Sequence, residues 1–397
     1  MTLLALPAPV RTAAPGFWAV AFAFLTTMAF STVPTPLYPL YVAREGFSTF
    51  TVTVVFAAYA LGVVASLLVA GPLSDRVGRR AVLVPALGLE LLAALLFLTS
   101  TSLPALLLAR LLNGLGVGVI SSTATAYLQE LNGRRFETVS TAANLGGLGL
   151  GTLVAGFLAQ FVDAPLRTPY VLFAVLLVLS TVAVALTPET VSVRQARPAR
   201  RVALGSPAAG AAGFAAFAVF GLFTSLAPAF VAGTLHHPSR ALAGAVVFAV
   251  FASATAAQLL TRHLPERPKA RLGLLAQAVG VLTLTAGVHL AGAAWFLVGG
   301  VVAGAGAGLS FKAAVGAVAR TAAPAARAAA LAGLFLVSYL GMVVPALGIG
   351  VAARTVPLAT ALTGFAVLHL FVLATAAALN GRRGLIKALM HGPTALR

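Results

Sequence analysis

Long apolar stretches recur along the whole chain of 397 residues and constrain its fold more than any other feature. Each is long enough for an α-helix to cross the ~30 Å hydrocarbon core of a bilayer, which takes about 20 residues at 1.5 Å per residue. Charged residues make up only 9% of the chain, against roughly 25% in a soluble domain. The sequence therefore predicts an all-α membrane protein with twelve transmembrane helices, at 17–42, 50–73, 82–101, 103–129, 138–162, 168–187, 207–233, 241–261, 271–291, 293–318, 328–353 and 356–379.

The first stretch is expected to stay in the mature protein. It is longer than the apolar core of a signal peptide, it continues through Pro34, Pro36 and Pro39, and no small-residue cleavage pattern ends it. The chain contains no cysteine, which removes disulfides, thiolate chemistry and cysteine-ligated metals from consideration. No cofactor and no metal site are predicted.

The net charge of +18 would suggest nucleic acid in a soluble protein, but its distribution indicates a membrane topology. With the N-terminus inside, twenty of the 26 basic residues fall on inward-facing segments and four on outer loops, and only Arg110 and Lys312 lie within spans. This bias is the positive-inside rule, and it places both termini in the cytoplasm. The lipid bilayer is the partner that the charge predicts, and nucleic-acid binding is not needed to explain it.

The longest polar stretch divides the chain into two halves of six spans each. It is rich in Pro and Arg, as expected of a solvated segment lying on an anionic leaflet. The predicted organisation is a lobe at 1–187, a cytoplasmic linker at 188–206, a second lobe at 207–379 and a cytoplasmic tail at 380–397. Three landmarks recur at an offset of 190 to 192 residues and suggest internal duplication: Pro36 and Pro228, Asp75-Arg76 and Glu266-Arg267, and the glycines 114, 116, 118 and 304, 306, 308.

A charged, glycine-bounded loop is predicted between the second and third spans, and it reads Gly71-Pro72-Leu73-Ser74-Asp75-Arg76-Val77-Gly78-Arg79-Arg80. It resembles the signature G-x-L-x-D-R-x-G-R-R of the major facilitator superfamily. The resemblance extends over essentially the whole chain and implies two six-helix lobes with a substrate cavity between them near the bilayer midplane. Spans 1, 4, 7 and 10 would line the cavity, and rocking of the lobes would expose it alternately to the two sides. It further implies a monomeric transporter in a bacterial inner membrane.

The motif is predicted to act as a conformational latch, formed by Gly71, Asp75, Arg76, Gly78, Arg79, Arg80 and Glu130. The two glycines permit close approach because they lack a Cβ. By resemblance, the Asp75 carboxylate would accept hydrogen bonds from the start of span 11 in the outward-open state. The arginines need an acidic partner, and Glu130 at the inner end of span 4 is the best candidate; the alternative is that they only set topology. The matching segment at 263–269 lacks the glycines, so no second latch is predicted.

Span 4 contains Arg110-Leu111-Leu112-Asn113-Gly114-Leu115-Gly116, which resembles the family motif R-x-x-Q-G-x-G with Asn113 in place of glutamine. A charge within hydrocarbon costs at least ~2.5–3.5 kcal/mol, so Arg110 should have a partner. Depth arithmetic places Glu90 of span 3 within roughly 7 Å of its height, which favours a direct Glu90–Arg110 pair. The alternative is that Arg110 tunes a carboxylate that exchanges protons during transport.

Lys312 in span 10 is the other charge within a span. Nineteen residues from the outer end put it about 28 Å deep, near the cytoplasmic side. A lysine there can snorkel to the interface at low cost, which is the favoured interpretation. The alternative is a cavity lysine that binds anionic substrate, because span 10 is a lining helix in the family.

Two patterns bear on coupling and substrate. Span 1 carries no acid, although proton-coupled members of the family often have one there, and span 5 has Thr152 where the antiporter motif G-x-x-x-G-P-x-x-x-G has its proline. Polar residues of the spans are candidates for substrate contact or for helix–helix hydrogen bonds. These cavity candidates are Tyr38, Tyr59, Asn113, Asn144, Gln258, Ser338 and Tyr339.

The sequence favours a secondary transporter over an enzyme, a channel or a receptor. A membrane enzyme would need clustered carboxylates or histidines, and of six histidines only His236 and His237 are adjacent, with no acid nearby. A channel would need a polar stripe or a charged ring. Because the lining spans are mostly Ala, Val, Leu, Phe and Gly, the predicted activity is efflux of small amphipathic or apolar compounds, with proton coupling left open. The alternative is uptake of a small polar metabolite such as a sugar or an organic acid.

Overall fold

The computed structural model describes residues 14–191, 203, 205–323 and 326–390, and all regular secondary structure within them is helical. Twelve of its helical segments are long and apolar enough to cross a membrane. The first half consists of α1 (Ala14–Thr32), η1 (Thr35–Leu37), α2 (Tyr38–Glu45), α3 (Thr49–Val77), α4 (Arg79–Thr99), α5 (Leu103–Leu131), α6 (Phe136–Thr141), the π-helical turn η2 (Ala142–Gly146), α7 (Gly147–Phe161) and α8 (Thr168–Ala185). The second half consists of α9 (Pro207–Ala229), the π-helical turn η3 (Phe230–Thr234), α10 (Arg240–Leu260), α11 (Glu266–His289), α12 (Ala293–Thr321), α13 (Arg327–Ala352) and α14 (Leu358–Met390).

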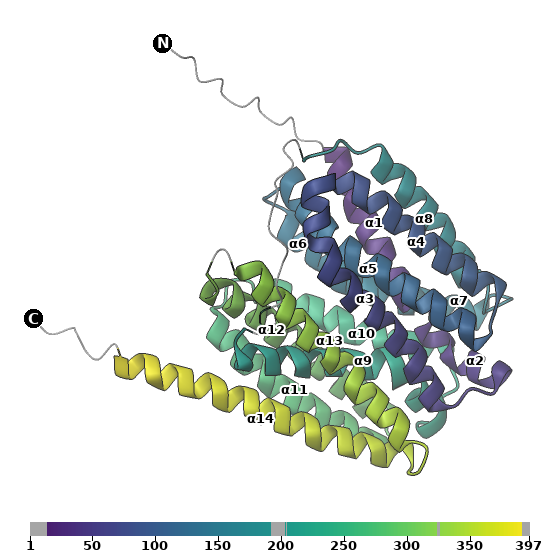
Figure 1. Cartoon of the computed structure of the whole chain (residues 1–397). Helices are drawn as coiled ribbons and strands as arrows, with labels where there is room; N and C mark the ends of the chain where they lie inside the picture. Colours follow the sequence, from purple (N-terminus) through teal and green to yellow (C-terminus); the bar gives the residue numbers. More distant parts are fainter. Residues whose placement is uncertain (1–13, 192–202, 204, 324–325, 391–397) are drawn as a thin grey trace, which may run out of the picture.

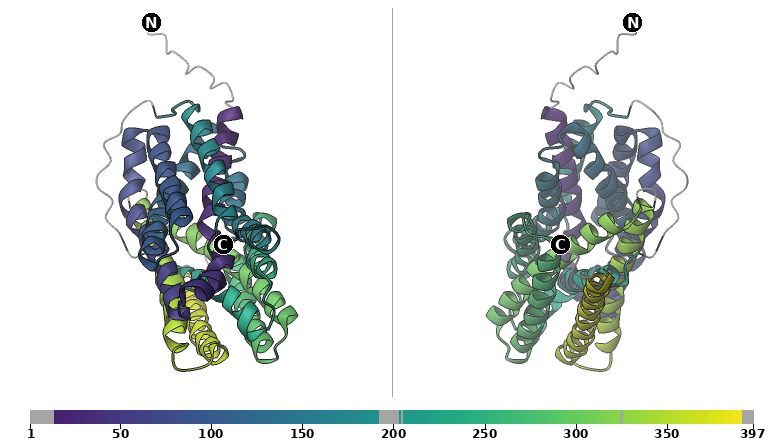
Figure 2. Two further views of the ribbon diagram at one scale, coloured as in Figure 1. Left: turned by 90° about the vertical axis from the view of Figure 1, so that its right-hand side faces the viewer. Right: turned by 90° about the vertical axis from the view of Figure 1, so that its left-hand side faces the viewer.

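The two halves form two helical bundles, the N lobe (α1–α8) and the C lobe (α9–α14), which lie against each other (Figure 1). The side views show the N lobe above the C lobe, with the ends of the bundles splayed (Figure 2). Each lobe has its own apolar core, and the N-lobe core also includes Met342 and Ala346 of α13. Many large apolar side chains stay exposed on the outer helices, for example Phe371 at 71%, as expected of surfaces that face lipid rather than water.

The two lobes contact each other chiefly through two helix pairs, α3 with α13 and α7 with α10. At the α7–α10 contact, backbone lies against backbone. A Cβ on Gly156 would sit 2.5 Å from the Arg240 carbonyl oxygen, and a Cβ on Gly244 would overlap the Thr152 carbonyl oxygen. The hydroxyl of Thr152 donates to the Gly244 carbonyl across the seam at 3.1 Å. The threonine that replaces the antiporter proline therefore helps to join the lobes.

The motif segment differs from its prediction as a loop. Helix α3 continues through Pro72 and Asp75 to Val77, and α4 begins at Arg79. Only Gly78 breaks the helical path, with φ +120°, a backbone conformation that favours glycine. The prediction was wrong because charged residues were taken to end the span, whereas the helix extends past the apolar stretch. In the same way α11 begins at Glu266 rather than near residue 271.

Candidate functional site

A cavity of about 470 Å³ lies between the two lobes and is the candidate site. Helices α1, α5, α9 and α12 contribute to its wall, as the resemblance implied for spans 1, 4, 7 and 10, together with α3, α6, α10 and α13. We call the end of the molecule that carries Gly78 the motif end, and the opposite end, which carries α2, the α2 end. The cavity reaches toward the motif end, where Ser122, Thr125 and Glu137 line it.

The two walls of the cavity differ in chemistry. The N-lobe wall is mostly polar and includes Ser31, Thr32, Thr35, Tyr59, Arg110, Ser121, Ser122, Thr125, Glu137, Ser140, Thr141 and Asn144. The C-lobe wall is mostly aromatic and includes Phe217, Phe220, Phe251, Phe311, Phe335 and Tyr339. Several of these rings pack in pairs, with centroids 4.9 Å apart for Phe217 and Phe311 and 5.2 Å for Phe217 and Tyr339. An amphipathic molecule would find a suitable partner on each side.

The structure places four of the seven predicted cavity residues in the wall: Tyr59, Asn144, Gln258 and Tyr339. The other three lie elsewhere. The side chain of Tyr38 is buried, the Asn113 amide is engaged by charged neighbours, and the Ser338 hydroxyl donates to the Leu334 carbonyl of its own helix at 2.8 Å. For these three, substrate contact stays a prediction, because membership of a lining span does not tell which face of the helix meets the cavity.

The lobes are joined at the α2 end by direct hydrogen bonds. The Thr35 hydroxyl donates to the Thr224 carbonyl at 3.0 Å, and the Arg240 guanidinium donates to the Ala159 carbonyl at 2.7 Å. The Gln160 side-chain oxygen accepts from the backbone N–H of Arg240 at 2.9 Å. These bonds close the α2 end of the cavity between η1, α7, α9 and α10.

An ion pair crosses between the lobes at the other end of the cavity. The Lys312 ammonium of α12 lies 2.9 Å from the Glu137 carboxylate of α6, and it also donates to the Gln258 carbonyl at 3.4 Å. The Glu137 side chain is 64% exposed, whereas that of Lys312 is 19% exposed. Snorkelling of Lys312 to the interface therefore stays a prediction, to which the structure adds a carboxylate partner on the facing lobe.

Arg110 and Glu90 are both buried, at 2% and 0% exposure, but they do not form a direct ion pair within 4 Å. Asn113 stands between them. Its amide nitrogen donates to Glu90 at 2.6 Å, and its oxygen accepts from Arg110 at 3.2 Å. The predicted direct pair is thus replaced by a bridged one, because Asn113 lies one helical turn after Arg110 and offers both a donor and an acceptor.

The motif residues form a compact ionic cluster around Arg79, which is 8% exposed. Its guanidinium lies 2.6 Å from the Asp75 carboxylate and 2.7 Å from the Glu130 carboxylate, and it donates to the Ser74 hydroxyl at 2.7 Å. Glu130 therefore supplies the acidic partner expected for Arg79. Arg80 instead extends to the end of α8, where its guanidinium lies 3.4 Å from the Ala185 carbonyl.

The N-terminus of α4 is capped by a residue that the sequence analysis did not single out. The Glu189 carboxylate accepts from the backbone N–H groups of Arg79 and Arg80 at 2.8 and 3.0 Å. Burial alone would raise the pKa of Glu189, but the backbone N–H donors, Arg79 first, outweigh it and hold this pKa below its ordinary value. A Cβ on Gly78 would lie 2.5 Å from this carboxylate, so the second motif glycine makes room for it.

The C lobe carries an ionic cluster at the equivalent place, with Arg320 at the position that matches Glu130. Glu266 at the start of α11 lies 3.3 Å from Arg320 at the end of α12 and 3.9 Å from Lys269. Glu130 and Arg320 are 190 residues apart, and Asp75 and Glu266 are 191 apart, so the positions match the repeat. In the N lobe one cation lies between two acids, whereas in the C lobe one acid lies between two cations. An ionic cluster is thus present at matching positions in both lobes, although no second latch was predicted for the C lobe.

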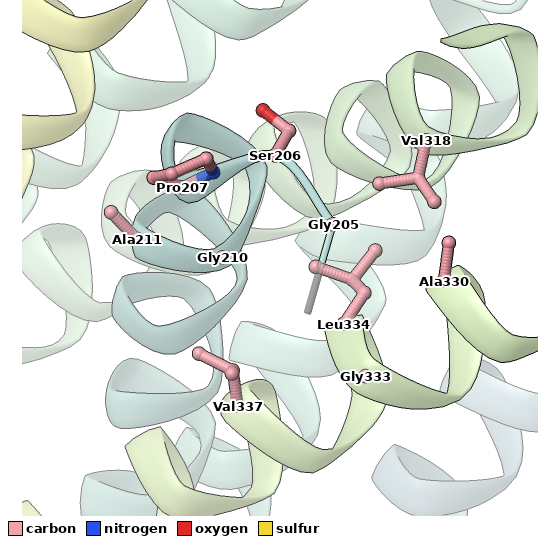
Figure 3. A pocket seen from close by; sticks show the side chains of 10 residues that line it. All are labelled: Gly205, Ser206, Pro207, Gly210, Ala211, Val318, Ala330, Gly333, Leu334 and Val337. Carbon is pink, nitrogen blue, oxygen red and sulfur yellow. The ribbon is translucent and has the colours of Figure 1, made fainter. Parts of the chain in front are cut away.

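Within the described ranges, no group of three or more His, Asp or Glu side chains lies close enough to hold a metal ion. A second cavity of about 250 Å³ lies where the start of α9 meets α12 and α13 (Figure 3). Its lining is small and apolar apart from Ser206, whose hydroxyl caps α9 by accepting from the Ala209 N–H. This lining offers packing rather than chemistry.

Two acidic residues of the ionic contacts were missed, and both had a usable signal. Glu137 follows Arg134 and Arg135 at the inner end of span 5, the same depth to which the arithmetic assigned Lys312. Glu189 comes directly after span 6, on the side of the membrane where the motif lies. Matching each buried cation to acids of equal depth on other spans would have found the Lys312 partner.

Comparison with known proteins gives a consistent picture. The chain is 37% identical over 105 residues to the 4-hydroxybenzoate transporter PcaK of Pseudomonas aeruginosa, which covers 26% of this chain and 23% of that protein. It is 34% identical over 125 residues to multidrug resistance protein D of Escherichia coli, covering 32% and 30%. These matches span less than a third of the relatives' length. The crystal structure of the nucleoside transporter NupG superposes with a TM-score of 0.73 at 13% identity, covering 92% of this chain and 99% of that one.

Helix count, two-lobed architecture and sequence converge on one family. The fold is shared with a known transporter over nearly the whole chain, and the motif residues that suggested the resemblance are assembled around Arg79. The sequence profile of the Major Facilitator Superfamily matches residues 20–346. The chain is a multi-pass membrane protein and belongs to the Major Facilitator Superfamily.

Proposed function

We propose that this protein moves small amphipathic molecules across the membrane by alternating access. The observation that carries the proposal is the cavity between the lobes, with its polar N-lobe wall and its aromatic C-lobe wall. Clefts of a few hundred Å³ that combine apolar surface with a few polar groups are typical small-molecule sites. A ligand lying between the lobes would contact both of them and could therefore bias their relative position.

The contacts at the two ends of the cavity suggest how access alternates. At the α2 end the lobes are hydrogen bonded through Thr35 and Arg240, and at the motif end the Glu137–Lys312 ion pair crosses between them. Opening the α2 end requires loss of the first set. We propose that the motif cluster around Asp75 and Arg79 then takes part in holding the motif end closed, as the latch predicted from the sequence.

The direction and the setting of transport also belong to the proposal. The distribution of basic residues supports a cytoplasmic motif end and cytoplasmic termini, in the inner membrane of a bacterium, with the protein acting as a monomer. Net efflux is the first choice, supported by the aromatic wall and by similarity to multidrug resistance protein D. Uptake is the second, supported by the polar N-lobe wall and by similarity to transporters named for 4-hydroxybenzoate and 3-(3-hydroxy-phenyl)propionate.

Reconstitution tests the proposal directly. Purified protein in liposomes is given a panel of radiolabelled amphipathic solutes, with protein-free liposomes as the control, and uptake is measured with and without an imposed pH gradient. We expect saturable, protein-dependent flux of at least one amphipathic solute. If only hydrophilic sugars are carried, the amphipathic class is wrong, and if no solute of the panel crosses, transport of this class is refuted. Stimulation by a gradient acidic on the side that the solute leaves would indicate symport with protons, and stimulation by the opposite gradient would indicate antiport.

A further inference from the structure

Arg110 presents an unpaired positive charge to the cavity. It lies about two turns from the start of α5, is 2% exposed, and belongs to the cavity wall. Its Nη1 donates to the Ser31 carbonyl at 2.7 Å and to the Asn113 side-chain oxygen at 3.2 Å. Its guanidinium carbon lies 4.4 Å from the centre of the Tyr59 ring. All of these partners are neutral, so none cancels the charge.

Glu90 does not occupy the face of Arg110 that borders the cavity. The carboxyl group reaches Arg110 only through Asn113, and it is enclosed where α4 packs on α5. A Cβ on Gly116 of α5 would overlap its Oε1 atom, which shows how closely the second helix covers it. Glu90 therefore supports Arg110 from behind without competing for a ligand in front.

Lys312, the other cation of the cavity wall, is already neutralised. Its ammonium forms the 2.9 Å ion pair with Glu137, whereas no carboxylate lies within 4 Å of Arg110 among the described residues. The two cations thus differ in what they can offer to a ligand. An anion that approached Lys312 would have to displace Glu137, but an anion that approached Arg110 would meet a guanidinium whose acidic neighbour, Glu90, is reached only through Asn113.

The donor geometry of Arg110 identifies the atom that would bind. Both hydrogens of Nη1 are used by Ser31 and Asn113, and Nε is enclosed without a partner. Within the described part of the chain, Nη2 makes no hydrogen bond, and unlike Nε it is not sealed off. Nη2 therefore keeps two N–H hydrogens for which the described residues provide no acceptor, and a carboxylate oxygen in the cavity could form charge-assisted hydrogen bonds with them.

We propose that Arg110 binds the anionic group of the transported molecule, and that this molecule is a small aromatic or otherwise apolar carboxylic acid. The carboxylate lies at Nη2 on the N lobe, and the ring lies against Phe217, Phe311 and Tyr339 on the C lobe. The inference rests on the proposed transport of amphipathic molecules and narrows it to acids held in one orientation. The substrate then bridges the lobes, with charge recognition on one and apolar contact on the other.

The test compares acids with their neutral amides of equal size. Benzoate and 3-phenylpropionate are each paired with benzamide and 3-phenylpropionamide, and binding to the purified full-length protein is measured by calorimetric titration and by ligand-induced thermal stabilisation. We expect each acid to bind at least about tenfold more tightly than its amide, as for a hydrogen bond to a charged group. This comparison needs no variant. Equal affinity of acid and amide, or tighter binding of the amide, would overturn the proposal.

Three variants assign any preference to a residue. Arg110→Gln should reduce the preference for acids over amides to about twofold or less, because the glutamine side chain still donates hydrogen bonds but carries no charge. Arg110→Lys should keep a weakened preference. The matched control is Arg167→Gln, which removes an exposed arginine that does not line the cavity and should leave the preference intact. A preference that survives in a folded Arg110→Gln protein, or that disappears in Arg167→Gln, would refute the role of Arg110.

Flux measurements separate this inference from the function on which it rests. If liposomes containing the protein carry the amides but not the acids, transport of amphipathic molecules stands and the Arg110 site is wrong. If neither class is carried, both proposals fail. If the acids are carried and Arg110→Gln abolishes their flux while sparing that of the amides, both are supported.

Discussion

The Glu137–Lys312 ion pair should restrain the opening of the cavity, because it is a charge contact between the lobes at the motif end. The perturbation is a double-mutant cycle of Glu137→Gln, Lys312→Gln and the two together. Each glutamine keeps a polar side chain of similar length and removes one charge. The cycle isolates the coupling between the two side chains from their other contacts.

The expected magnitude follows from the geometry and exposure of the pair. Two unit charges 2.9 Å apart attract by about 1.4 kcal/mol in a water-like dielectric, and more where the surroundings are drier. The Glu137 side chain is 64% exposed, so most of the larger value is lost to solvent screening and to side-chain entropy. Measured exposed pairs give about 0.2–1 kcal/mol, and a coupling of about 0.5–1 kcal/mol shifts a two-state equilibrium about two- to fivefold.

The absence of native cysteine provides the assay. A single Ser122→Cys substitution places one thiol in the cavity wall, and its alkylation rate by a membrane-impermeant maleimide reports how often the motif end is open. We expect either single variant to raise this rate about two- to fivefold, with little further increase in the double variant. At 1 M salt, where the Debye length is about 3 Å, the parent protein should approach the rate of the variants.

Three results would refute this reasoning. Alkylation rates that stay unchanged in both single variants would show that the ion pair does not restrain opening of the motif end. Effects that add in the double variant would show that the two charges act independently. A rate insensitive to salt in the parent protein would show that the contact is not electrostatic at all. A thiol at Ser100, outside the cavity and partly exposed at the α2 end, serves as the control for general changes in reactivity.

Three further predictions concern the motif end and the buried acid. Asp75→Asn should preserve expression and membrane insertion but impair flux, because it weakens the cluster around Arg79; normal flux at normal expression would count against the latch. Glu189→Gln should lower stability by roughly 0.3–1 kcal/mol at neutral pH by weakening the cap of α4, as seen in thermal unfolding. Folding lowers the pKa of Glu189, so the stability difference between parent and variant should be fully present above about pH 4.3. It should vanish as the pH falls through the folded-state pKa. A stability difference that is unchanged at pH 3 would contradict this. Glu90→Gln keeps an acceptor for Asn113 and should leave the pH dependence of flux unchanged, whereas loss of that dependence would identify Glu90 as a proton carrier.

The helices of this fold could be predicted from sequence because lipid imposes a simple rule, that about 20 apolar residues make one span. The same rule failed at span ends. Helix α3 runs on through the charged residue Asp75 and α11 starts at the charged residue Glu266, since a helix can leave the apolar layer without ending. What ended α3 was Gly78, a local backbone requirement rather than hydropathy.

Ionic partners were only partly predictable. Glu130 was found for Arg79 because both lie in one lobe at the same end of neighbouring spans. The partner of Lys312 was missed because it lies on the other lobe, and pairing across lobes depends on how they sit together, which no local pattern records. Asn113 was taken for a substrate contact because its amide was considered alone, without the two charges that it joins.

The glycine seam between α7 and α10 has a mechanical consequence. Where two helices pack through interdigitated side chains, one helix can rotate on the other only if those side chains repack. At this seam Gly156 and Gly244 present bare backbone, and hydrogen bonds from Thr152 to Gly244 and from Arg240 to Ala159 and Gln160 link the two helices. We therefore expect the lobes to rotate relative to each other about this contact with little side-chain repacking. The surface on which the lobes move is then the peptide backbone itself, and a side chain at either glycine would add a steric barrier to that motion.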